Sequence, residues 1–108
     1  MRKKRELDVQ VARRLDWYDI SWNEDSQDFM GKDPDTGAYR PIPAFTVNLV
    51  DAIQILSIMD LQGFSWEINR SGVSFIKDNH IFYTEYTGFM NLSMALCNAA
   101  IQALEGPR

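Results

Sequence analysis

The chain has 108 residues, of which 45% are hydrophobic and 24% charged, a composition typical of one small globular domain. Its eleven basic and fifteen acidic residues give a net charge of −4, which argues against a general nucleic-acid binder. One cysteine and one histidine exclude a disulfide framework, multi-cysteine zinc motifs and paired-histidine metal motifs within this sequence. We therefore expect no cofactor and no metal ion.

Basic residues gather at the start of the chain, and acidic residues follow in its first third. Residues 2–5 are all lysine or arginine, and we expect residues 1–5 to form a solvated, disordered arm, with phosphate contact as the alternative. Seven acids lie between Asp16 and Asp35, where Lys32 is the one basic residue. No apolar run approaches the roughly 18 residues of a membrane span, so we expect no membrane contact.

The first elements are a helix and a strand. Apolar residues recur every four positions at Leu7, Val11 and Leu15, which predicts an amphipathic helix over 6–15. Alternating apolar and polar residues over 17–22 predict a half-buried strand. Because neighbours in a strand face opposite sides, we expect Trp17 and Tyr18 to differ in burial.

The next segment, residues 23–41, is predicted to be an acidic loop of a single domain that extends over 6–106. Pro34 and Gly37 suit a tight turn, and Tyr39 is expected to return beside the first strand in a short hairpin. Polar loops of this length are uncommon in compact domains, so we expect this one to be functional or poorly ordered.

Two further helices are indicated by their capping residues. Asn48 is a suitable N-cap for a helix that ends at Gly63, with Asp51 as its capping-box partner. Asn91 is a suitable N-cap for a last helix of small residues, which Gly106 and Pro107 end.

Three strands are predicted between these helices, over 64–69, 73–76 and 81–86, with Trp66 in the core. The order of elements is therefore α-β-α-β-β-β-α. A meander needs at least one covered face, and amphipathic helices can cover both. We therefore predict a mixed α/β (α+β) fold, a three-layer α/β/α sandwich whose sheet is mainly an antiparallel meander.

Three stretches resemble the phage ABA-sandwich domain family, a group of small proteins encoded by phages and prophages. They are the opening from Leu7 to Trp17, the proline-aromatic-threonine entry into the central helix over 42–52, and the small-residue helix over 92–104. Asn48 stands where the family usually has aspartate, and the acidic segment over 25–35 is not part of the family pattern. The resemblance implies this fold and a phage accessory protein, a setting in which small proteins often blunt host defence. Because the sequence shows no secretory signal and no membrane span, we expect the host cytoplasm.

No catalytic motif is present, and we predict that the protein is not an enzyme. His80 is expected in a surface turn, and Cys97 lies among small apolar residues, which indicates a buried thiol rather than a nucleophile. Asp33 and Asp35 have the spacing of a calcium loop's start, but Ala44 stands where the bidentate glutamate is needed.

Unlike catalysis, ligand binding is compatible with the residues of this sequence. An exposed ring beside a cation can stack a nucleobase while the cation contacts phosphate, and a helix N-terminus offers free N–H groups. The alternative is that the rings fill the core and the cations are solvated. The candidate ligand-binding residues are Trp17, Tyr18, Trp22, Arg40, Asn48, Arg70, Lys77 and Asn91.

Two binding hypotheses follow, beside a third in which a phage accessory protein has no inhibitory role. The first is sequestration of a phosphate-bearing nucleotide immune signal; because one chain supplies few cations, it predicts a homo-oligomer with a shared pocket. The second is an acidic inhibitor that docks on a basic groove of a host nuclease or defence effector. The candidate partner-binding residues are Glu24, Asp25, Asp28, Asp33 and Asp35.

Overall fold

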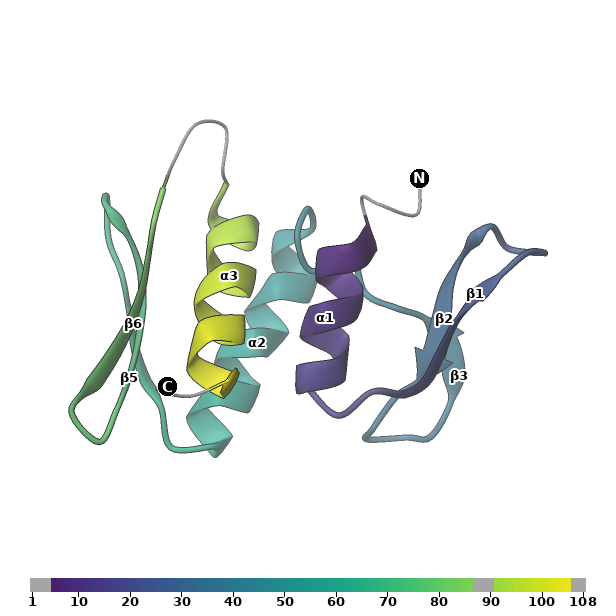
Figure 1. The fold of residues 1–108 in the computed structure, drawn as a ribbon, viewed down its shortest axis with the longest axis horizontal. Coiled ribbons are helices and arrows are strands. Elements are labelled where there is room, and N and C mark those ends of the chain that lie inside the picture. Colours follow the sequence, from purple (N-terminus) through teal and green to yellow (C-terminus); the bar gives the residue numbers. More distant parts are fainter. Residues whose placement is uncertain (1–4, 87–90, 106–108) are drawn as a thin grey trace.

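A computed structural model describes residues 5–86 and 91–105, and within them the chain forms three helices and two antiparallel sheets (Figure 1). The predicted arm at residues 1–4 and the predicted helix end at Gly106 and Pro107 lie outside the described residues. The mixed α+β class predicted from the sequence is confirmed.

The three helices lie together in the middle of the molecule (Figure 1). They are α1 (Glu6–Arg14), α2 (Leu49–Leu61) and α3 (Leu92–Glu105). The third helix packs against both of the others, and its small residues Ala95 and Ala99 are fully buried. Small side chains let neighbouring backbones approach closely, which places α3 at the centre of the core.

The predicted meander is confirmed as one of the two sheets. It consists of β4 (Ser65–Ile68), β5 (Gly72–Lys77) and β6 (His80–Glu85) in that order, all antiparallel. The third helix covers β5 and β6, where Val73 and Phe75 are fully buried. Trp66 is exposed rather than in the predicted core, because β4 is an edge strand with a neighbour on one side only.

A second sheet forms from the segment that was predicted to be a strand followed by an acidic loop. It consists of β1 (Tyr18–Asn23), β2 (Asp28–Lys32) and β3 (Tyr39–Pro41), with β2 in the middle. Tyr39 is therefore opposite Lys32 of β2, not beside the first strand as predicted. The predicted turn is present, with Gly37 at a φ of +73° that favours glycine.

The order of layers differs from the predicted α/β/α sandwich, which is not confirmed. The helices lie between the β4–β6 sheet on one side and the β1–β3 sheet on the other (Figure 1). The prediction assumed one sheet, but β1 pairs with β2 in a sheet that is separate from the β4–β6 meander.

The predicted alternation of β1 is interrupted by an irregularity in its pairing. The register with β2 shifts between Tyr18 and Ser21, and Asp19 has a φ of +52°. Trp17, just before the strand, is buried while Tyr18 is exposed, so the expected difference between these neighbours is confirmed. Trp22 contacts the ring of Phe29 edge-on, at 5.2 Å between ring centroids.

The predicted caps of α2 and α3 are largely confirmed. Asn48 accepts the Asp51 N–H at 3.2 Å, and Asn91 accepts the Met94 N–H at 2.8 Å. The Asp51 carboxylate accepts the Ala44 N–H at 3.0 Å instead of closing a capping box with Asn48. Gly63 follows α2 with a φ of +90°, as expected of a residue that ends a helix.

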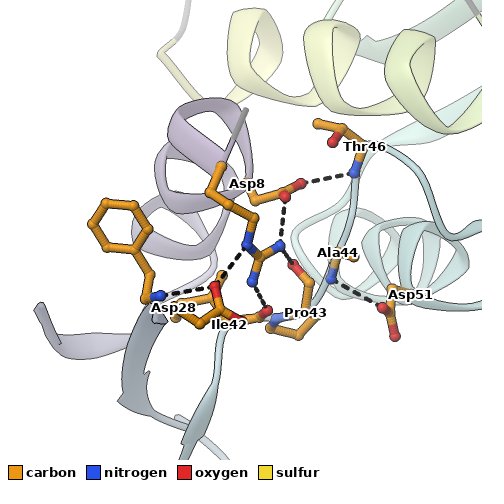
Figure 2. A network of polar contacts seen from close by, with 9 residues as sticks. Asp8, Asp28, Ile42, Pro43, Ala44, Thr46 and Asp51 are labelled. Carbon is orange, nitrogen blue, oxygen red and sulfur yellow. Dashed lines mark hydrogen bonds and ion pairs between the residues drawn. The ribbon is translucent and has the colours of Figure 1, made fainter. Parts of the chain in front are cut away.

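A polar cluster joins α1 to the second sheet and to the chain before α2 (Figure 2). The Asp8 carboxylate is 1% exposed, and it accepts Arg5 Nη1–H at 2.6 Å and the Thr46 N–H at 2.8 Å. Arg5 also donates through Nε to Asp28 of β2 at 3.0 Å and through its Nη groups to the Ile42 and Pro43 carbonyls. Arg5 is therefore part of the fold, whereas the sequence placed it in a solvated arm.

We expect the Arg5→Ala substitution to lower the free energy of unfolding by about 3 kcal/mol, because it leaves the Asp8 carboxylate buried without its cation. The measurement is urea denaturation at neutral pH. Arg14→Ala is the control: the Arg14–Glu105 ion pair is partly exposed, and its loss is expected to cost less than about 1 kcal/mol. Equal unfolding midpoints for the two variants would show that the Arg5 contacts contribute little.

Candidate functional site

A hollow of about 290 Å³ opens where α1, α2 and the β1–β3 sheet meet. This volume lies at the lower end of the range for small-ligand pockets. Its buried lining consists of three apolar residues, Leu15, Trp17 and Phe45, and of Asp33, whereas its more exposed lining is mixed. We call it the Arg40 hollow; its polar lining residues are Asp16, Asp33, Asp35, Arg40, Gln54 and Gln62.

Arg40 is held in place by an acid and an aromatic ring. Its Nε and Nη2 groups donate to the same oxygen of Asp33, Oδ2, at 3.0 and 2.6 Å. Its guanidinium lies over the Trp17 ring, 4.6 Å from the centroid, a cation–π arrangement. The positive charge of Arg40 is therefore already paired within the protein.

Asp33 is held just as firmly. Its second oxygen, Oδ1, accepts the Asp35 N–H at 2.8 Å. The hydrogen bonds from Arg40 and then from the Asp35 backbone lower the pKa of Asp33, while burial opposes them in part. Asp33 therefore stays ionised at neutral pH and its charge is balanced by Arg40.

Two other acids of the hollow are not balanced in this way. Within residues 5–86 and 91–105, no hydrogen bond or ion pair holds the side-chain carboxylate of Asp16 or Asp35. Of the described lining residues, Arg40 is the only lysine or arginine. The hollow therefore combines an apolar floor with a net negative rim, a combination that favours a cationic group attached to an apolar stem.

The structure brings together only two of the eight candidate ligand-binding residues, Trp17 and Arg40. The Lys77 ammonium donates to the Gln62 carbonyl at 2.8 Å and lies 5.0 Å from the centroid of the Phe64 ring. The remaining five belong to other parts of the fold: Tyr18 and Trp22 to β1, Arg70 to the turn before β5, and Asn48 and Asn91 to the helix caps.

The five candidate partner-binding acids are also divided. Asp33 and Asp35 line the hollow, and Asp28 is paired with Arg5 at 3.0 Å. Glu24 and Asp25 lie in the turn between β1 and β2. Sequence reasoning counted Asp16 in the acidic segment over 16–35 but did not name it as a partner-binding residue; its φ is +72°.

Cys97 is buried, as predicted, and His80 is exposed at the start of β6. Burial, with a smaller contribution from the negative charge of Asp8, raises the pKa of the Cys97 thiol to about 12. Among the residues that the structure describes, no group of three or more histidine, cysteine or acidic side chains is placed to hold a metal ion. No helix in this part of the chain is long and apolar enough to span a bilayer.

No family model, curated protein or solved structure matches this chain. The resemblance to the phage ABA-sandwich family therefore stays a prediction. Function has to be inferred from the chemistry of the hollow itself.

We expect the Asp33→Asn substitution to cost about 1 kcal/mol of stability at neutral pH, a modest value because Arg40 is partly exposed to solvent. The pKa of Asp33 is lowered on folding from its usual 3.8, so its contribution is present above that pH and is lost as the pH falls through the folded pKa. Urea denaturation at pH 7 and pH 3 should therefore show a smaller difference between wild type and variant in acid.

Asp35→Asn is the matched control in the same turn and should change stability little at either pH. A difference between wild type and Asp33→Asn that is the same at both pH values would contradict the ion pair.

Because its pKa is about 12, the Cys97 thiol should resist iodoacetamide at pH 8 in the folded protein and react once urea unfolds the chain. The folded state keeps the thiol proton where the unfolded state loses it, so stability should also fall as the pH rises above 9.0. Mass spectrometry of the alkylated peptide measures the first effect. Rapid labelling of the folded protein would show that Cys97 is accessible.

Proposed function

We propose that this protein is a non-enzymatic accessory protein that acts by stoichiometric binding to a partner protein. In this proposal the Arg40 hollow receives a lysine or arginine side chain of the partner. One observation carries it: among the described residues, no group pairs with the carboxylates of Asp16 and Asp35 at the hollow, while Arg40, the one described cation of its lining, is paired with Asp33.

The shape and chemistry of a long basic side chain suit this hollow. Its aliphatic stem would lie against the apolar floor formed by Leu15, Trp17 and Phe45. Its charged head would reach Asp16 and Asp35, and a charge-assisted hydrogen bond to a carboxylate is stronger than a neutral one. Gln54 and Gln62 add side-chain amide groups to the lining.

A phosphate group suits the hollow less well. It would approach the carboxylates of Asp16 and Asp35, which have no partner in the part of the chain that the structure describes. Arg40, the one lysine or arginine among the described lining residues, is already paired with Asp33. Arg40 already lies over the Trp17 ring, so a nucleobase would have to displace Arg40 to stack there. Sequestration of a phosphate-bearing nucleotide stays a prediction, and it would need cations from a second copy of the chain.

The setting is supported by the sequence resemblance alone. In a phage accessory protein, the partner would be a host nuclease or defence effector with a basic groove, met in the host cytoplasm. Such grooves carry the positive potential with which nucleases bind nucleic acid, and an acidic hollow complements it.

Nuclear magnetic resonance titration tests the proposal with two probes, a short arginine-containing peptide and a cyclic dinucleotide. The peptide should shift the indole N–H signal of Trp17 and the side-chain amide signals of Gln54. Its affinity should fall at least about tenfold in a variant that combines Asp16→Asn with Asp35→Asn, and it should weaken as salt is added. Asparagine tolerates the positive φ of Asp16, so this variant keeps the backbone.

Asp25→Asn is the matched control, because it removes one charge from the β1–β2 turn and leaves the hollow intact. It should bind the peptide as the wild type does. Shifts of the Trp17 signal with the dinucleotide and none with the peptide would overturn the proposal and favour sequestration.

A further inference from the structure

The first half of α2 and the turn just before it expose an apolar surface that belongs neither to the core nor to the Arg40 hollow. Val47 and Val50 are 72% and 75% exposed, and Leu49 and Ile53 are also exposed. Val50 and Ile53 are three residues apart and Leu49 and Ile53 four apart, so their side chains are neighbours on the helix. We call these four residues the α2 face.

The α2 face is free of charge in a chain that carries fifteen acids and a net charge of −4. None of its four residues is charged, and α2 contains no lysine or arginine. Asp51, the one acid in the first turn of the helix, is half-buried and accepts the Ala44 N–H at 3.0 Å. Asn48, which begins the helix, is neutral and caps it.

We propose that the α2 face binds a second copy of this chain, so that two α2 helices pair about a twofold axis. In a twofold dimer the same surface meets itself, and any charge on it would face its like. An uncharged apolar surface avoids this repulsion even though both chains are acidic.

Because the α2 face is uncharged, it does not suit the basic partner of the proposed function. A basic groove would bury its lysine and arginine side chains against four residues that offer no counter-charge, which is costly. Asp60, the exposed acid of α2, lies two helical turns beyond Ile53. The basic partner is therefore expected at the Arg40 hollow, whose lining residues on α2 begin at Gln54. The two inferences rest on different residues and can fail separately.

The area of the α2 face indicates how tightly two copies of the chain should bind each other. Its four side chains expose roughly 400 Å² per copy, comparable to the largest apolar patch on a typical monomer, and such patches are often functional. Burying it on both copies removes roughly 800 Å² from water, which corresponds to a weak and reversible interface. The dimer should therefore form and dissociate with protein concentration.

Sedimentation velocity of the full chain at a series of concentrations tests the proposal. The wild type should shift from monomer to dimer as its concentration rises. Val50→Glu and Ile53→Glu each place a charge on the face, and each should raise the dimer dissociation constant at least about tenfold. Both sites are solvent-exposed, and circular dichroism checks that the variants remain folded.

Ile81→Glu is the matched control, since Ile81 is 67% exposed on β6, away from α2, and this variant should dimerise like the wild type. A wild-type chain that stays monomeric at every concentration would overturn the proposal. So would a dimer that survives both α2 variants, or one that only Ile81→Glu dissociates, because the outer surface of the β4–β6 sheet would then be the interface.

Discussion

The fold depends on the stabilisation of one buried negative charge, the carboxylate of Asp8. A buried negative charge needs a cation and hydrogen-bond donors, and Arg5 and the Thr46 N–H supply them. Arg5 then reaches Asp28 of β2 and the carbonyl groups before α2, which attaches the β1–β3 sheet to the helices (Figure 2). The Arg40 hollow lies at the opposite end of α1, where the same sheet and helices meet again.

The pairing of Arg40 with Asp33 explains why the described lining of the Arg40 hollow is net negative. Arg5 and Arg40 are each paired with an acid inside the protein, so both serve to hold the small sheet in place. Asp16 and Asp35 are left at the rim of the hollow without a partner among the described residues. Part of the net charge of −4 is therefore concentrated at the rim of the Arg40 hollow, and electrostatic recognition requires such a localised charge.

The sequence predicted the elements whose signals are local and missed what depends on distant contacts. The helices and the meander follow from apolar periodicity, from Asn48 and Asn91 as caps and from Gly63 as a stop. The strand over 17–22 was predicted, but β2 was missed because it lies in an acidic segment that was predicted to be a loop, so Tyr39 was placed beside the first strand instead of β2. Arg5 was misplaced because it ends a run of basic residues. The hollow joins residues from Leu15 to Gln62 on several elements, so no single stretch marks it.

Amide hydrogen exchange of wild type and an Asp8→Asn variant tests most directly whether this polar cluster holds the β1–β3 sheet against the helices. Asparagine keeps the size of the side chain and removes its charge. The amides of β1–β3 should lose protection well beyond any loss in β4–β6, which contacts the helices through apolar side chains. An equal loss in both sheets, or none in either, would contradict the account.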